Sequence, residues 1–196
     1  KVPPLPPVGN PGYWCPEQID KFFACVDREA NPEQYTLLLF SASTGMRPEE
    51  ICALRVGDVD ISTKTVAVKH ALAYGLDGIY EKGTKSGAGK RRLPLMEDLA
   101  TQLAAWLEIR GNDENAWLFP SPADWASHIG VNRPNKWFNE ARDAANLKPK
   151  LSLYGLRHSF VTNALRAGVD PSAVYHLAGH ASPEMVMKVY AGLNEV

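Results

Sequence analysis

The 196-residue sequence contains no long hydrophobic run, although 45% of its residues are hydrophobic. A membrane-spanning helix needs about 20 consecutive apolar residues, and no run in this chain approaches that length. The beginning of the chain, KVPPLPPVGNPGYWCP, also lacks the hydrophobic core of a signal peptide. These absences exclude a transmembrane helix and lead us to expect a protein of the cytoplasm.

Cysteine is also scarce, with Cys15, Cys25 and Cys52 only. Three cysteines cannot all pair within one chain, and none has C-x-x-C spacing, so the pattern is typical of reduced thiols rather than of disulfides or a zinc site. His176 and His180 lie four residues apart. We expect Gly179 to end a helix between them, and no third ligand is near. We therefore predict no metal ion.

Net charge is nearly absent, at -1, which argues against binding to nucleic acid through bulk charge alone. The basic residues are nevertheless clustered, with no acid between residues 82 and 92 or between 146 and 169. The first cluster alone is typical of a solvated hairpin, but two such stretches could form one positive face along a phosphate backbone. The basic residues that we expect to contact nucleic acid are Lys82, Lys90, Arg91, Arg92, Arg133, Lys136, Lys148 and Lys150.

The dipeptide Gly89-Lys90 invites comparison with a phosphate-binding loop. That loop pattern requires glycine at position 84 and serine or threonine at position 91, where this chain has Thr84 and Arg91. We therefore predict no nucleotide site, and the rest of the chain suggests no other cofactor.

The chain is long enough for one domain with a substantial core. Six prolines in the first sixteen residues predict an extended, poorly packed linker over residues 1–16, followed by one domain over 17–196. Helical periodicity indicates helices from Pro16 to about Arg28, after Pro32, from Pro48, from Glu97 to a stop at Gly111, and over 132–145. Alternation predicts strands over 65–70, around Ile79 and over 91–95, with 117–120 extended.

Residues 151–190 bring together the side chains Arg157, His158, His180 and Tyr190. On their own they could belong to two ordinary amphipathic helices. Upstream, Arg47 stands at a helix junction just before Pro48, with Glu50 in reach to orient it. Two arginines can hold the two non-bridging oxygens of one phosphodiester, and a tyrosine hydroxyl can attack phosphorus if cations or a base activate it. Lys85, at the hairpin turn, could protonate a leaving oxygen.

Four segments carry a resemblance to a known family: TGMRPEEICALRVGDVD, TKSGAGKRRLPL, LSLYGLRHSFVTNAL and HLAGHASPEMVMKVYAGL. In order and spacing they resemble the catalytic domain of the tyrosine recombinases, the phage integrase family, from about Glu17 to the end. The resemblance implies a mainly α fold with a small antiparallel β-sheet (α+β), related to the catalytic fold of type IB topoisomerases.

Position by position, the resemblance implies that Tyr190 attacks the scissile phosphate and forms a 3′-phosphotyrosyl link. Arg47 and Arg157 would stabilise the phosphorane, and Lys85 would be the general acid. His180 would hydrogen-bond a phosphate oxygen or the nucleophile. Supporting positions are Glu50, which matches the family's acidic residue, and His158. No metal or cofactor is implied.

The chain departs from the family at one position, since Tyr154 stands where members usually have histidine. A phenol is a poor base near neutral pH, but it can donate a hydrogen bond to a phosphate oxygen. The general base is therefore left unassigned, and we expect Tyr154 to hydrogen-bond the phosphate.

The implied partner is double-stranded DNA at recombination sites. Family members form tetramers on DNA by exchanging the segment after the nucleophile, and they carry a further N-terminal DNA-binding domain that this sequence does not include. Only Ala191–Val196 follow Tyr190 here, so we expect this chain alone to be monomeric. Two alternatives remain open from the sequence: a type IB topoisomerase-like enzyme that relaxes DNA, and a DNA-binding regulatory module without catalysis.

Overall fold

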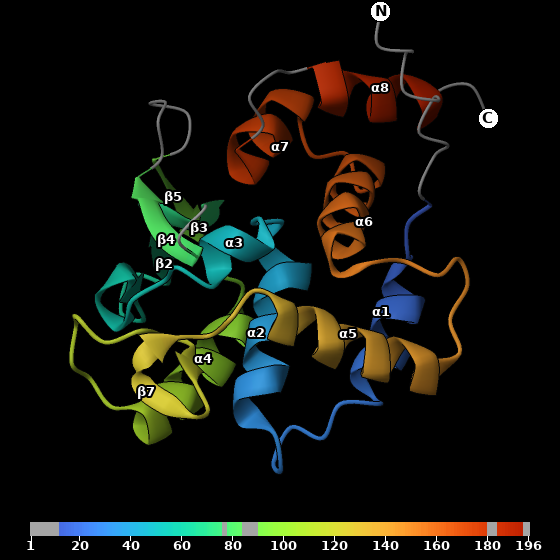
Figure 1. Ribbon diagram of the computed structural model, residues 1–196. Helices are drawn as coiled ribbons and strands as arrows, with labels where there is room; N and C mark the ends of the chain where they lie inside the picture. The colour runs from blue at the N-terminus through green and yellow to red at the C-terminus, as the bar shows by residue number, and fades with distance from the viewer. Residues whose placement is uncertain (1–11, 76–77, 84–89, 180–183, 194–196) are drawn as a thin grey trace, which may run out of the picture.

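The computed structural model describes residues 12–75, 78–83, 90–179 and 184–193. Most of them are helical, and the strands form small antiparallel sheets, which confirms the predicted fold class (Figure 1). The helices are α1 Pro16–Phe23, α2 Pro32–Thr44, α3 Pro48–Ile51, the 3-10 turn Val56–Asp58, α4 Glu97–Arg110, α5 Asn132–Ala145, α6 Leu153–Arg166, α7 Pro171–Ala178 and α8 Glu184–Leu193. None of these helices, which belong to the described residues, is long and apolar enough to cross a membrane.

The described residues form three sheets, all antiparallel. The first has strand order β1-β2-β5, the second pairs β3 with β4, and the third pairs β6 with β7. The strands are β1 Val59–Asp60, β2 Thr65–Val68, β3 His70–Gly75, β4 Gly78–Gly83, β5 Arg91–Pro94, β6 Pro120–Ser121 and β7 Asp124–His128. The predicted strand over 65–70 is therefore divided between β2 and β3.

Prolines and glycines set the helix boundaries much as their backbone preferences require. Proline occupies the first turn of α1, α2, α3 and α7, where its missing N–H costs nothing. Gly45 ends α2 with a left-handed φ of 61°. The predicted helix from Pro16 ends early, at Phe23, and the N–H groups of Cys25 and Val26 then donate three residues back instead of four. A turn follows, in which Asp27 accepts from the N–H groups of Glu29 and Ala30.

Trp14 differs from the expectation of a loose segment over residues 1–16, because it is completely buried. Its ring packs beside Phe22 and Phe138, and its backbone N–H donates to Ser159 Oγ at 3.0 Å. The packed domain therefore begins no later than Trp14, because a buried tryptophan contributes a large apolar area to the core.

The three C-terminal helices share a small core of their own, built from Val161, Leu165, Val174, Ala178 and Val186. In Figure 1, α7 (orange-red) lies between β5 and α6, and α8 (red) lies above α6. Contacts between α7 and β5, and between α6 and α2, join this unit to the rest of the molecule. This arrangement brings the end of α7 close to the start of α3.

Candidate functional site

Arg47 stands immediately before α3, and its backbone and side chain both bind Glu50. Glu50 Oε2 accepts from the backbone N–H of Arg47 at 3.0 Å, and Oε1 accepts from Arg47 Nη1 at 3.1 Å. The Arg47 side chain is 33% exposed, whereas that of Glu50 is 4% exposed. Glu50 thus holds Arg47 at both its backbone N–H and its Nη1, while about a third of the Arg47 side chain stays exposed.

Arg91 is the second arginine that pairs with Glu50, whereas the sequence led us to expect it to contact nucleic acid. Its Nη1 donates to Glu50 Oε1 at 3.1 Å and its Nη2 to Oε2 at 2.8 Å. Its Nε donates to the carbonyl of Leu177, at the end of α7, at 3.0 Å. With 8% of its side chain exposed, Arg91 faces the interior rather than a DNA surface. Strand alternation was the available signal, since Arg91 shares the inner face of β5 with buried Leu93 while Arg92 points outward.

Arg157, on the second turn of α6, is only 2% exposed. Its Nη1 donates to the carbonyls of Gly45 and Ala178, which ties α6 to the turn before Arg47 and to the end of α7. Its Nε and Nη2 are buried and have no hydrogen-bond partner among the described residues. A buried cation with two unsatisfied donors is costly, and an anion placed against it would remove that cost.

The charges of this cluster act on one another. Burial pushes the pKa of Glu50 upward, but hydrogen bonds and charge from Arg91, together with Arg47, outweigh it and hold that pKa below its usual value. Burial also lowers the pKa of Arg157 to about 10, assisted by the positive charge of Arg47, while Tyr154 and Glu50 oppose the shift. Because this value is far above neutrality, Arg157 stays charged at pH 7.

Tyr154 and His158 flank Arg157 on α6. Tyr154 is 51% exposed and lies three residues before Arg157, about one helical turn away on α6. His158 is half-buried, and burial lowers its pKa, which favours the neutral imidazole at pH 7. The structure thus leaves Tyr154 exposed about one turn of α6 before the buried Arg157.

Three residues of the predicted catalytic set are not placed by the structure. Lys85 and His180 lie outside the described residues. Tyr190 lies on α8, but its side chain is outside the described part of the chain. Glycine at 179, just before His180, ends α7 with a φ of 66°, as the sequence predicts. No group of three or more His, Cys, Asp or Glu that could hold a metal occurs among the described residues.

The other basic residues expected to contact DNA lie at the surface. Arg92 hydrogen-bonds Thr65, while Arg133 stacks over the ring of Trp137. Lys136 on α5 is 3.8 Å from Glu140, and Lys150 in the second basic stretch is 3.7 Å from Asp143. Nearby acids therefore offset part of the charge of each lysine. The exposed residues of the set are Lys82, Lys90, Arg92, Arg133, Lys136, Lys148 and Lys150.

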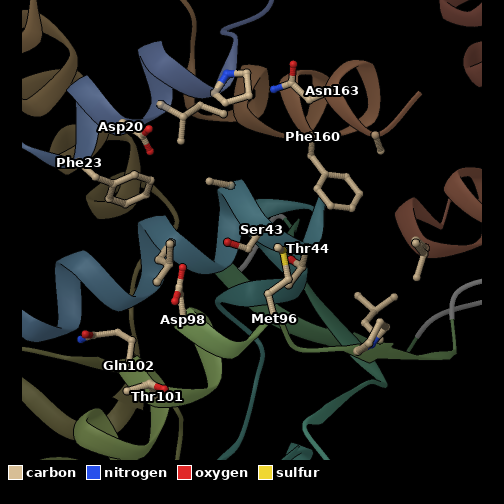
Figure 2. A pocket seen from close by; sticks show the side chains of 18 of the residues that line it. Asp20, Phe23, Ser43, Thr44, Met96, Asp98, Thr101, Gln102, Phe160 and Asn163 are labelled. Atoms are coloured by element: carbon tan, nitrogen blue, oxygen red, sulfur yellow. The ribbon is translucent and has the colours of Figure 1, made fainter. Parts of the chain in front are cut away.

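A separate cavity of about 860 Å³ lies between α1, α2, α4 and α6 (Figure 2). The rings of Phe23 and Phe160 line it, with Met96 and the carboxylates of Asp20 and Asp98. None of Arg47, Glu50, Arg91 or Arg157 does. A mainly apolar cavity with acidic groups does not suit a phosphate.

Residues 14–195 match the model of the phage integrase family, which is most of the chain. The chain therefore belongs to the phage integrase family, the tyrosine recombinases. The arginine cluster described above falls within this match.

Curated relatives agree with this assignment. The transposase from transposon Tn916 of Enterococcus faecalis is 26% identical over 194 residues, which cover 89% of this chain and 46% of the relative. Tyrosine recombinase XerA of Thermococcus kodakarensis is 26% identical over 180 residues, covering 92% of this chain and 58% of the relative. The chain thus spans about half the length of these relatives.

Solved structures show the same fold. The Tn1549 transposon integrase in complex with a circular intermediate DNA superimposes with a TM-score of 0.81 at 20% identity, over 97% of this chain and 67% of that one. The crystal structure of XerA recombinase gives a TM-score of 0.75 at 22% identity, over 97% and 64% of the two chains. The fold of this chain is therefore that of integrase catalytic cores.

Proposed function

We propose that the chain is the catalytic domain of a site-specific DNA recombinase, which cleaves and rejoins strands through a 3′-phosphotyrosyl intermediate and integrates or excises a mobile element. The observation that carries this proposal is the pair of unsatisfied, buried donors on Arg157. They lie in one cluster with Arg47, whose side chain is partly exposed. A phosphodiester would satisfy both arginines at once.

The proposed reaction makes one bond and breaks one. The Tyr190 oxygen attacks phosphorus and becomes esterified to the 3′ phosphate, while the bond from phosphorus to the 5′ oxygen breaks. Lys85 gives its proton to that leaving oxygen, and the attacking hydroxyl gives its own proton to water. Arg47 and Arg157 balance the extra negative charge on the pentavalent phosphorus, and removing one such donor typically costs about 3 kcal/mol of transition-state stabilisation. Religation runs the same steps backward from another 5′ hydroxyl.

The partner in this proposal is double-stranded DNA, and the full assembly is a tetramer on paired sites, as expected from the family. The Tn1549 integrase structures contain DNA, and XerH recombinase has been captured bound to its difH substrate in a post-cleavage complex. Support within this chain comes from three exposed basic residues, Lys82 on β4, Lys90 just before β5 and Arg92 on β5.

Covalent capture tests the proposal and does not require a defined target site. Nicked duplexes of randomised sequence are incubated with the protein. The protein is then denatured in detergent, and the DNA that stays covalently attached to it is recovered. The wild-type chain should retain DNA that converges on one sequence over several rounds. Tyr190→Phe should retain none, and Tyr35→Phe, a matched change in the aromatic core, should behave as wild type. Retention without any convergence of sequence would instead indicate topoisomerase-like relaxation, and sequence-specific binding without attachment would indicate a regulatory module.

A further inference from the structure

Arg91 binds two separate parts of the candidate site through different nitrogens. Its two terminal nitrogens bind both oxygens of Glu50, just after Arg47, and its Nε binds the carbonyl of Leu177, at the end of α7. The planar fork of arginine can make these contacts together, because its donors point in fixed and divergent directions. A lysine has one ammonium group and cannot reproduce them all.

The first of these contacts controls the charge of Glu50. That carboxylate is 4% exposed, and burial alone would favour its neutral form. Arg47 precedes it on the chain, Arg91 faces it from β5, and Arg157 faces it from α6 beside Tyr154. Of these, Arg91 makes the largest contribution to keeping Glu50 ionised. A neutral Glu50 would lose much of its hold on Arg47.

The second contact fixes the end of α7 beside Arg157. Arg91 binds the carbonyl of Leu177, and Arg157 binds the carbonyl of Ala178, the next residue. Cations at a helix C-terminus satisfy its free carbonyls and complement its dipole. The two arginines therefore hold consecutive carbonyls of one turn, immediately before Gly179.

We propose that Arg91 is a positioning residue of the cleavage reaction, which holds Glu50 against Arg47 and holds the last turn of α7 against Arg157, so that both phosphate-binding arginines face one phosphate. This inference rests on the proposed function. It gives Arg91 a role inside the site instead of the DNA contact that its place in a basic cluster suggests.

The test is the pH dependence of single-turnover cleavage, measured with a saturating duplex from the capture selection. In the wild type, the rate falls at low pH as Glu50 becomes protonated, below the ordinary pKa of a glutamate. Arg91→Gln removes the largest influence that lowers the pKa of Glu50, so the fall in rate at low pH, the acid limb of the profile, should move to higher pH. The plateau rate should also drop about 10²-fold, because Arg47 and Arg157 are no longer held in place. Arg91→Lys should keep the acid limb near that of the wild type, because a positive charge remains, but should still lower the plateau because the Leu177 contact is lost.

Arg92→Gln is the matched control, since it removes the same charge from the next residue of β5. It should weaken DNA binding and leave the acid limb unmoved. An Arg91→Gln profile that coincides with the wild-type profile overturns the proposal. If Arg91→Gln fails to fold, Arg91→Lys decides the question, and a wild-type plateau in that variant overturns the proposal.

A second readout separates this inference from the proposed function. Carbon-13 carboxyl shifts report the titration of Glu50 directly and need no DNA. The expected result is titration at higher pH in Arg91→Gln than in wild type, and wild-type titration in the variant would refute the inference even if cleavage is observed. If no covalent adduct forms but Glu50 titrates at higher pH in Arg91→Gln than in the wild type, only the proposed reaction is refuted.

Discussion

The guanidinium of Arg91 lies directly against Gly179, so that a Cβ on this glycine would come within 2.6 Å of Arg91 Cζ. Gly179 also has a φ of 66°, in the left-handed region that favours glycine. Two independent constraints therefore act on the residue that precedes His180. One concerns the backbone alone, and the other concerns Arg91.

These constraints can be separated by comparing Gly179→Ala with Gly168→Ala. Gly168 has a φ of 83° and open space where a Cβ would stand, so its alanine variant should lose only the backbone preference, about 1–2 kcal/mol of unfolding free energy. Gly179→Ala should lose more unfolding free energy than Gly168→Ala, because Arg91 must also shift. Because Arg91 shifts, this variant should also cleave DNA more slowly. Urea unfolding and single-turnover cleavage measure the two effects. Equal losses in the two variants would show that Arg91 is not packed on Gly179.

Tyr154 gives a prediction about the phosphate. Its side chain is exposed beside Arg157, where a hydroxyl can donate to a bound phosphate oxygen. Tyr154→Phe should slow single-turnover cleavage about tenfold, which is the value of one hydrogen bond to a charged group at the low end of its range. Tyr154→His, which supplies the residue usual in the family, should cleave at least as fast as wild type. An unchanged cleavage rate in Tyr154→Phe would contradict a hydrogen bond from Tyr154 to the phosphate.

Glu33, in the first turn of α2, gives a prediction about stability near neutral pH. Burial raises its pKa to about 7, although Arg133 and Arg110 oppose the shift. The folded state therefore binds a proton more tightly than the unfolded state, whose glutamate titrates near 4.5. This stabilising contribution is complete below pH 4.5 and is lost as the pH rises through 7. Urea unfolding between pH 4.5 and 8 should show this loss in the wild type and a weaker one in Glu33→Gln; parallel curves would contradict it.

Binding to DNA should depend steeply on salt, because contacts to phosphates release counterions. A fluorescence-anisotropy titration over a range of salt concentrations gives the slope of log Kd against log salt. Lys90→Gln should reduce that slope by about one unit. Lys64→Gln is a suitable control, because Lys64 pairs with Glu97 and belongs to neither basic stretch, and its slope should equal the wild-type value. A dissociation constant that does not change with salt would exclude a phosphate-backbone interface.

Local patterns in the sequence were sufficient for much of the fold. The helix over Asn132–Ala145 is confirmed at both ends, and Gly111 ends α4 as expected, because amphipathic spacing and caps are local signals. The two-residue strand β1 was missed, since two residues cannot show an alternating pattern, and β6 overlaps the extended segment predicted over 117–120 only at Pro120. The strand β7 was also missed, and its residues are mostly exposed, so it has no apolar face to detect.

The site was predictable as a set of residue types but not as a set of contacts. Motif spacing singled out Arg47, Glu50 and Arg157, and the structure brings these three together. The binding of Arg91 to Glu50 joins residues 41 positions apart and depends on how β5 packs against α3 and α7. Charge clustering drew attention to Arg91 and Arg92 equally, whereas the pleat of β5 sends them to opposite sides.

Covalent attachment of Tyr190 to DNA is the central step of the proposed reaction. The most direct measurement is mass spectrometry of the trapped adduct after nuclease and trypsin digestion. Cleavage after Lys188 releases residues 189–196, and this peptide contains Tyr190 as its one tyrosine. We expect this peptide to carry the mass of a 3′-linked nucleotide remnant, on Tyr190. A remnant on any other residue, or an adduct that still forms with Tyr190→Phe, would contradict the proposed reaction.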